Sequence, residues 1–216
     1  MKKLITEEEI LKLSAEGNRE IRITKNTILT PSALDRIRSL KIKIIEGEQL
    51  DNESSLPIQN NEIKTIAIGS DHTGFEMKKV VSDYLKNKNY KVIDVGTKDT
   101  RSCDYPDFAL AVAQKRLSGE ADNGIMIDAT GIPSAITINK LPGIRAATCY
   151  NEFSARSARE HNNACVLCVG GKTLGEESIK SIIDVFLKTE FLGGRHQRRI
   201  DKITAVENKL LNRNNS

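Results

Sequence analysis

The sequence predicts an α/β fold, in which a doubly wound domain surrounds a parallel sheet and a small α/β piece precedes it. Five short apolar runs alternate with helical patterns after residue 64, the order of strands and crossover helices in such a sheet. The runs are apolar at nearly every position, as strands buried on both faces are. A length of 216 residues suits one full domain plus a smaller one.

The first 46 residues predict helix, strand, helix and strand in that order. Thr6 to Glu9 is a capping-box pattern that opens a helix over about 6–16, and 20–24 alternates as a strand does. Thr30 and Pro31 supply the cap and first-turn proline of a second helix, and 42–45 follows as a strand. All nine aromatic residues lie at or beyond Phe75, so this piece must pack on aliphatic side chains, and no internal repeat is apparent in it.

Residues 47–64 are polar, contain Pro57 and show no sustained period, which predicts a flexible linker. Beyond it, the runs that predict strands are 65–69, 91–95, 124–127, 145–148 and 165–169. Helical patterns lie near 74–88, 106–118, 132–140, 152–160 and 175–188, followed by a C-terminal helix. We therefore predict three parts: an N-terminal extension over 1–46, a linker over 47–64 and a main domain over 65–216.

Charge and cysteine content narrow the class of protein. The 33 basic and 29 acidic residues are spread along the chain and give a net charge of +4, whereas nucleic-acid binders concentrate basic residues among aromatic ones. No apolar run reaches the roughly 18–20 residues that cross a bilayer, and the N-terminus turns acidic before any signal core develops. Four cysteines in a chain of this size are more typical of reduced thiols than of disulfides. We expect a cytoplasmic protein that binds neither nucleic acid nor membrane.

Polar side chains that can carry chemistry lie next to the predicted strands. In an open parallel sheet the ligand crevice lies beyond the carboxyl ends of the strands. Asp71 and His72 follow the first run, Asp128, Thr130, Gly131 and Ser134 follow the third, and His161 with Asn162 precedes the fifth. We expect these groups to meet at one end of the sheet, where the turn at Thr130 and Gly131 would offer N–H groups to an anion or an enediolate oxygen. Asp71 and Asp128 are also well placed to cap the helices that follow them.

Arg195 and Arg199 stand four residues apart in a basic cluster, so a helix there would present both on one face. That spacing suits a bidentate grip on phosphate, and the alternative is a solvated basic surface. Cys165 and Cys168 lack a second ligand pair, so we expect no metal site and interpret them as buried small hydrophobes. The stretch 69–74 lacks the glycines of a dinucleotide fingerprint.

Eight motifs in the main domain carry a family resemblance. They are IAIGSDHTGFEMK, DVGT, DYPDFA, GEADNGIMI, TGI, INKLPGIRAA, FSARSAREHNNA and FLGGRHQRRIDKITAVE, in this order between Thr65 and Glu207. This segment resembles the type B ribose-5-phosphate isomerases and the galactose-6-phosphate isomerase subunits. The resemblance implies a Rossmann-like three-layer α/β/α sandwich and a homodimer, or dimer of dimers, with sites between subunits. It also implies interconversion of aldose and ketose phosphates without a cofactor.

The resemblance assigns roles to individual residues. Asp71 and His72 match the pair that handles the ring oxygen and the phosphate, and His161 matches the histidine of ring opening. The remaining matches are Tyr105 lining the substrate, Thr130 and Gly131 holding the enediolate, Asn162 at the sugar hydroxyls, and Lys172, Arg195 and Arg199 at the phosphate. Moving a carbonyl between C1 and C2 takes a base, donors for the enediolate and an anchor for the phosphate.

The base departs from the family pattern. Asp128 stands where many type B members carry a cysteine, and Ala129 and Pro133 replace glycines. Other members use a glutamate at the position of Ser134, which we assign to substrate binding because it has no carboxylate. An aspartate at this point resembles the A subunit of galactose-6-phosphate isomerase, which works with a different B subunit. Our hypothesis is that Asp128 abstracts the carbon-bound proton.

The sequence therefore predicts a sugar-phosphate isomerase, an intramolecular oxidoreductase that acts on a pentose, tetrose or hexose phosphate. The alternative is a protein that binds a sugar phosphate without turnover, or a partner subunit of a heteromeric isomerase. The first 46 residues resemble more loosely the N-terminal segments of some bacterial microcompartment enzymes, which implies docking to a shell. The alternative for this extension is a stabilising or oligomerising role.

Overall fold

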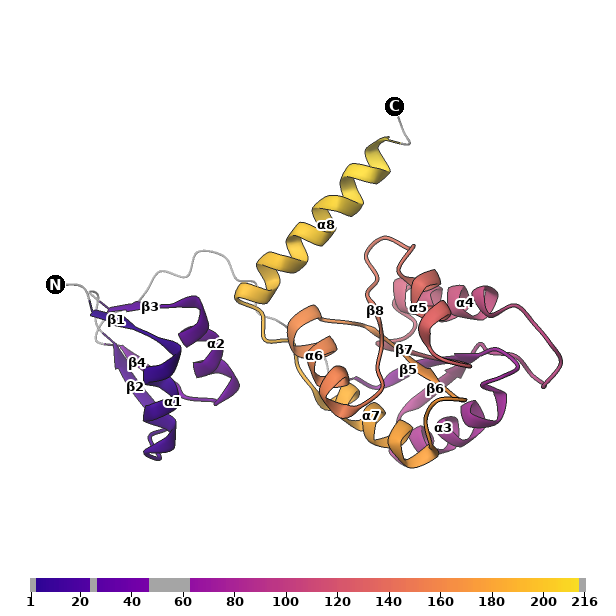
Figure 1. The fold of residues 1–216 in the computed structure, drawn as a ribbon, viewed down its shortest axis with the longest axis horizontal. Helices are drawn as coiled ribbons and strands as arrows, with labels where there is room; N and C mark the ends of the chain where they lie inside the picture. Colours follow the sequence, from indigo (N-terminus) through magenta and orange to yellow (C-terminus); the bar gives the residue numbers. More distant parts are fainter. Residues whose placement is uncertain (1–2, 24–26, 47–62, 214–216) are drawn as a thin grey trace. The chain divides into compact units, whose positions relative to one another are not determined.

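The computed structural model describes residues 3–23, 27–46 and 63–213, so most of the predicted linker, 47–62, lies outside the described residues. The chain divides into two compact units, both drawn in Figure 1. The first contains the described residues up to 46 together with 192–202, and the second contains 63–191 and 203–213. A short segment near the C-terminus thus groups with the N-terminal extension.

Among the described residues, the first unit contains six short elements and the beginning of the last helix. They are β1 (Lys3–Ile5), α1 (Glu7–Ala15), β2 (Glu20–Ile23), β3 (Thr27–Leu29), α2 (Pro31–Ser39) and β4 (Lys43–Glu46), followed by α8 (Arg195–Arg213). The Glu9 carboxylate accepts the Thr6 N–H at 2.9 Å, and Thr30 Oγ1 accepts the Ala33 N–H at 3.1 Å. Both helices therefore begin at the predicted caps, which satisfy N–H groups that a helix start leaves unpaired.

The first unit repeats one strand–helix–strand motif, which the sequence did not reveal. The order β1-α1-β2 is followed by β3-α2-β4, and equivalent strands pair in parallel, Ile5 opposite Leu29 and Ile21 opposite Ile44. The expectation of no internal repeat is therefore wrong. Strands β1 and β3 were also missed, because three residues are too few to show a period of two.

The core of the first unit is small and aliphatic. One buried cluster contains Ile5, Ile10, Ile21, Ile23, Ala33, Ile37 and Ile42. A core of this size supplies little stability, so contacts that tie its helices to other segments of the unit carry more weight than they would in a larger domain.

The second unit is built on a parallel sheet of five strands in the order β6-β5-β7-β9-β8. The strands are β5 (Thr65–Ser70), β6 (Lys91–Asp94), β7 (Asn123–Asp128), β8 (Ala146–Thr148) and β9 (Val166–Gly170). The helices are α3 (Phe75–Asn87), α4 (Tyr105–Leu117), α5 (Ile132–Ile138), α6 (Glu152–Asn162) and α7 (Glu176–Lys188). The predicted doubly wound α/β fold is confirmed.

Helices cover both faces of this sheet and make a three-layer sandwich (Figure 1). Ile66 and Ile68 pack on one side with α3, α6 and α7, whereas Ala67 and Met126 pack on the other with α4 and α5. The central strand β7 is buried along its whole length. Because both of its faces are covered, its sequence is continuously apolar and does not alternate.

The winding direction of the second unit reverses between β5 and β7. Strand β6 lies on one side of β5, and β7, β9 and β8 follow on the other. The loops after β5 and β7 therefore leave the sheet toward opposite faces, and ligands of open α/β sheets bind at this switch point. In the part of the chain that the structure describes, no helix has both the length and the apolar composition of a membrane span.

Candidate functional site

Three loops meet at the carboxyl edge of the sheet, after β5, β7 and β9. The Asp71 N–H donates to the Ile127 carbonyl oxygen at 3.3 Å, which joins the loop after β5 to the end of β7. The Gly171 N–H donates to the Asp128 carbonyl oxygen at 2.8 Å, which joins the ends of β7 and β9. Main-chain hydrogen bonds thus hold together the loops that carry most of the residues selected from the sequence.

Asp71 stabilises the turn that leads into α3. Its Oδ1 accepts the N–H groups of Thr73 (2.9 Å) and Gly74 (3.1 Å) and the hydroxyl of Thr73 (2.6 Å). Its Oδ2 makes no hydrogen bond with any residue that the structure describes. Asp71 therefore acts as a cap through Oδ1 alone, and its role toward the substrate stays a prediction.

His72 is held through one ring nitrogen. The Cys103 N–H donates to His72 Nδ1 at 3.3 Å, and the Cys103 sulfur lies 3.8 Å from the same atom. A ring nitrogen that accepts a hydrogen bond carries no proton, so the neutral imidazole is protonated at Nε2 and can donate from there to a ligand oxygen. The sequence analysis missed Cys103, because 31 positions separate it from His72.

Asp128 is buried, with 1% of its surface exposed, and its carboxylate caps α5. Oδ1 accepts the N–H groups of Thr130 (2.7 Å) and Gly131 (2.5 Å), and Oδ2 accepts the N–H (3.1 Å) and the hydroxyl of Ser134. Gly131 has a φ of +79°, a left-handed conformation that a residue without Cβ adopts at no steric cost. The carboxylate therefore occupies the N–H groups that the sequence analysis assigned to an enediolate oxygen.

Two predicted roles consequently fall on the same atoms. Asp128 cannot contact a ligand while it caps α5, and Thr130 and Gly131 cannot donate to an oxyanion while they bind Asp128. Ser134 is 0% exposed, so in this conformation it holds Asp128 and does not line a ligand pocket. The role of Asp128 as base stays a prediction, and it requires the carboxylate to rotate away from α5.

Tyr105 and Lys172 lie at the same edge of the sheet. Tyr105 is the half-buried first residue of α4 and follows the loop that contains Cys103. Lys172 comes after β9 and has an exposed side chain, and its N–H donates to the Ala129 carbonyl oxygen at 3.1 Å. A flexible ammonium group beside this turn can reach an anion that binds there.

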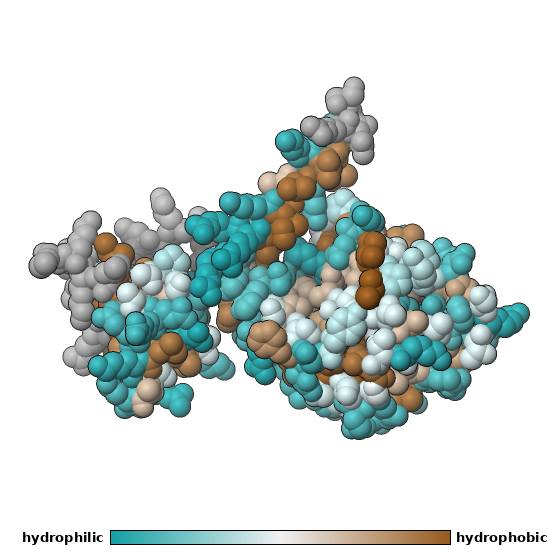
Figure 2. All heavy atoms as spheres, in the orientation of Figure 1, coloured by the Kyte–Doolittle hydropathy of each residue, from teal (hydrophilic) through white to brown (hydrophobic). Residues whose placement is uncertain are grey.

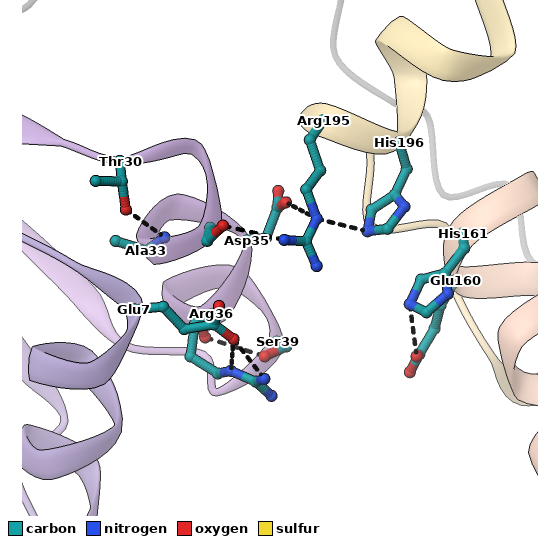
Figure 3. Close-up of polar contacts among 11 residues, drawn as sticks. Glu7, Thr30, Ala33, Asp35, Arg36, Ser39, Glu160, His161, Arg195 and His196 are labelled. Carbon is teal, nitrogen blue, oxygen red and sulfur yellow. Dashed lines mark hydrogen bonds and ion pairs between the residues drawn. The ribbon is translucent and has the colours of Figure 1, made fainter.

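His161 and Asn162 lie at the opposite edge, so the expected coincidence with Asp128 at one end of the sheet is wrong within one chain. The cleft implied by the resemblance, which takes His161 from the neighbouring protomer, stays a prediction. They end α6, which leads into the amino end of β9, whereas Asp128 pairs with Gly170 at the carboxyl end. Residues before and after a parallel strand belong to opposite edges of the sheet. His161 Nε2 lies 3.9 Å from the carboxylate of Glu160, on its own helix (Figure 3).

Arg195 and Arg199 lie one turn apart on α8 and share a face, as predicted from their spacing. Both belong to the segment that groups with the first unit. Arg199 is exposed, whereas Arg195 contacts α2: its Nε lies 3.2 Å from Asp35 Oδ2, and its Nη1 donates to Ser32 Oγ at 3.0 Å (Figure 3). Their role at the phosphate stays a prediction. No sequence pattern indicates the partners on α2, which are distant along the chain.

The buried cysteines are unsuited to nucleophilic chemistry. Burial raises the pKa of Cys149 to about 11 and that of Cys168 well above its usual value, which leaves little of the reactive thiolate. Cys165 and Cys168 both pack in the core layer against α4 and α5, as small hydrophobes do. Within the described ranges, no three His, Cys, Asp or Glu side chains gather as the ligands of a metal ion would.

The fold and the residues at the carboxyl edge define a doubly wound α/β protein with a polar site at the switch point of its sheet. Comparison with known proteins identifies the family within this class. The family model described as Ribose/Galactose Isomerase matches residues 66–203, and the chain belongs to this family. The N-terminal extension lies outside the matched segment.

Individual relatives agree with the family match. Ribose-5-phosphate isomerase B of Escherichia coli (strain K12) is 42% identical over 147 residues, which are 68% of this chain and 99% of that protein. The structure of Clostridium thermocellum ribose-5-phosphate isomerase B has a TM-score of 0.67 and 49% identity, over 68% of this chain and 99% of the other. That of Mycoplasma genitalium ribose-5-phosphate isomerase B with bound ribulose-5-phosphate has a TM-score of 0.64 and 44% identity, over 67% and 96%. The resemblance noted in the sequence is confirmed.

Proposed function

We propose that this chain is an aldose–ketose isomerase that converts a sugar phosphate through an enediolate. The observation that carries the proposal is that Asp71, His72 and Asp128 lie on bonded loops at the switch point of the sheet, within the segment that matches the family. Relatives named as isomerases match the chain along nearly their whole length, so a role as a binding protein or partner subunit without turnover is not favoured.

The residues divide the reaction between them. Nε2 of His72 donates to a substrate oxygen, and Oδ2 of Asp71 accepts a sugar hydroxyl. Asp128 takes the proton from the hydroxyl-bearing carbon beside the carbonyl and returns it to the former carbonyl carbon. The proton of that hydroxyl passes to the former carbonyl oxygen, so the substrate is isomerised and the protein ends in its starting protonation state. Tyr105 lines the substrate, and Lys172, Arg195 and Arg199 bind the phosphate, whose binding energy positions the reacting carbons.

One rotation of the Asp128 side chain would place the base near the substrate and free the N–H groups that bind the enediolate. When the carboxylate turns toward the substrate, the N–H groups of Thr130 and Gly131 lose their internal acceptor. They can then donate to the enediolate oxygen, whose negative charge replaces that of the carboxylate at the start of α5. The Asp128 side chain thus caps α5 in one position and acts as the base in the other.

Turnover by the purified protein tests the proposal. Ribose 5-phosphate, a tetrose phosphate and a hexose phosphate are compared, and we expect conversion of ribose 5-phosphate, because the relatives above carry its name. The Asp128→Asn protein, purified in parallel, reveals any isomerase carried over from the expression host. Binding of these sugar phosphates without conversion of any of them would overturn the proposal.

We also propose that a second copy of the chain completes the site. His161 and Asn162 lie at the sheet edge opposite Asp128, so they cannot serve the same site within one chain. The family resemblance assigns both residues to the substrate. A homodimer that brings the α6 end of one copy to the carboxyl edge of the other satisfies both conditions.

Apolar surface in the second unit supports this assembly. Exposed side chains form a row on one face of α8, at Ile203, Val206 and Leu210, where Figure 2 shows brown atoms among hydrophilic ones. Phe153 on α6 is 78% exposed and lines a hollow of about 570 Å³ beside the edge strand β8. Contiguous apolar surface of this kind is typical of protein interfaces.

Replacing Phe153 with Ser is expected to raise the dissociation constant of the homodimer at least about tenfold, because burying a Phe side chain contributes about 1.5–3 kcal/mol. Sedimentation velocity over a concentration series measures the change. Leu117→Ser is the matched control, since Leu117 is 49% exposed at the end of α4, on another helix. A wild-type chain that stays monomeric, or equal dissociation constants in the two variants, would contradict the assembly.

For the N-terminal extension we propose docking to the shell of a bacterial microcompartment in the cytoplasm, with 47–64 as the tether and 65–216 as the isomerase domain. The support is the loose resemblance of the first 46 residues, together with their place outside the family match. Co-sedimentation of the full chain with purified shells tests the docking. Equal amounts of chain in the pellet with and without shells would favour an oligomerising or stabilising role.

A further inference from the structure

We propose that Asp35, in the N-terminal extension, is a positioning residue that orients Arg195 for phosphate. The inference rests on the proposed function, in which Arg195 binds the phosphate of the sugar. Its structural basis lies wholly within the first unit, between α2 and the beginning of α8.

Arg195 is held at two of the three nitrogens of its guanidinium group (Figure 3). Nε lies 3.2 Å from Asp35 Oδ2 and 3.4 Å from Nε2 of the buried His196, and Nη1 donates to Ser32 Oγ at 3.0 Å. These contacts fix the plane of the guanidinium. Nη2 donates no hydrogen bond to the residues that the structure describes, so its two hydrogens remain for an anion.

Asp35 depends on Arg195. The residue is 5% exposed, and neither carboxylate oxygen has a hydrogen-bond partner of good geometry among the described residues. The ion pair with Arg195 is therefore the interaction that compensates this buried charge. Removing the partner of a buried charge lowers the equilibrium constant for folding by a factor on the order of 10²–10³.

The cost of breaking the ion pair with Asp35 determines how Arg195 can bind a phosphate. A hydrogen bond to a charged group strengthens binding by roughly 10–100-fold. This gain does not exceed the loss that would follow if Arg195 left Asp35 to bind the phosphate. Arg195 therefore stays paired and binds the phosphate through Nη2. Because Asp35 already orders the long side chain, less conformational entropy is lost on binding.

Gly194 lies directly against this contact. Its φ is +54°, and a Cβ at this position would collide with Asp35 Oδ1 and lie 3.2 Å from Nη1 of Arg38. The backbone before α8 thus combines a conformation that favours glycine with a close approach that needs one.

Phosphate binding and steady-state kinetics of the full chain test the inference. We expect Asp35→Ala to weaken the binding of inorganic phosphate about tenfold in calorimetry, and to raise KM about tenfold with kcat unchanged, the pattern of lost uniform binding. The variant leaves no unpaired charge in the core, because Arg195 is partly exposed and can be solvated. Ser32→Ala is a milder second variant. We expect it to weaken phosphate binding about threefold, which is the size of effect that one neutral hydrogen bond supplies.

Glu7→Ala is the matched control, because it breaks the ion pair between Glu7 and Arg36 (2.7 Å) in the same unit without touching Arg195. Phosphate binding and KM should stay at wild-type values in this variant. A tenfold loss in Glu7→Ala as well would show a general effect of loosening the unit and overturn the positioning role.

Arg195→Ala separates the inference from the function on which it rests. If Arg195→Ala weakens phosphate binding and neither Asp35→Ala nor Ser32→Ala does, Asp35 does not position Arg195 and only the inference is overturned. If no variant changes phosphate binding while the wild-type chain still isomerises, the inference falls with the assignment of Arg195, and the isomerase proposal stands. Tighter phosphate binding in Asp35→Ala would show competition with the phosphate and would also overturn the positioning role.

Discussion

Replacing Asp128 with Asn is expected to lower kcat by about 10³-fold, within the range that loss of a general base produces. An amide cannot take the carbon-bound proton, but it keeps the shape of the side chain. Its oxygen can still accept the N–H groups of Thr130 and Gly131, which bind Asp128 Oδ1 at 2.7 and 2.5 Å. Because other residues bind the phosphate, the dissociation constant of the sugar phosphate should stay within about twofold. Turnover and calorimetric binding measure the two quantities.

Asp122→Asn is the matched control for this prediction. The Asp122 carboxylate also accepts main-chain N–H groups, from Lys64 at 2.9 Å and Thr65 at 2.8 Å, but at the amino edge of the sheet. Its loss should therefore leave kcat unchanged. A rate within tenfold of wild type in Asp128→Asn would show that another group is the base. Equal losses of rate and binding would show that Asp128 serves mainly to hold its turn.

The second unit could be predicted from sequence because its elements are long and regular. Strand β7 is a continuous apolar run because helices cover both of its faces. Once the strands are known, the residues that follow them must lie at the carboxyl edge, since parallel strands all end there. Asp71, Asp128 and Lys172 could thus be placed at one edge without a structure.

Two kinds of feature could not be predicted from the sequence. One is the edge of the sheet at which a residue lies when it precedes a strand, and the other is a contact between segments that are distant along the chain. His161 precedes its strand, so the rule for residues that follow a strand does not place it, and the order of elements does not show which site of a dimer it joins. The hydroxyl of Ser134 binds Asp128 only because the turn at Gly131 reverses the chain between them. The ion pair of Asp35 with Arg195 joins helices from the two ends of the chain, and neither helix pattern contains a sign of the other.

Gly74 is a second position at which a small change should have a large effect. It begins α3 with a φ of −96°, which alanine adopts without strain. The added Cβ would nevertheless collide with the carbonyl oxygen of Ile127 and lie 2.8 Å from the carbonyl carbon. That oxygen accepts the Asp71 N–H at 3.3 Å, and Ile127 directly precedes Asp128. Any shift that relieves the collision therefore moves Asp71 or Asp128.

We expect Gly74→Ala to lower kcat/KM by about 10²-fold, because misplacing a reacting group by about 1 Å has an effect of that size. It should also lower the free energy of unfolding by about 1–3 kcal/mol, the usual cost of overpacking, as measured by urea denaturation. Gly175→Ala is the control, since Gly175 also precedes a helix, α7, and nothing lies within 4 Å of its added Cβ. If both variants kept the wild-type kcat/KM, catalysis would not depend on the contact between the β5 and β7 loops. A site that depends on the present spacing of Asp71 and Asp128 would then be contradicted, because the loops that carry them would have adjusted to the added Cβ without loss of activity.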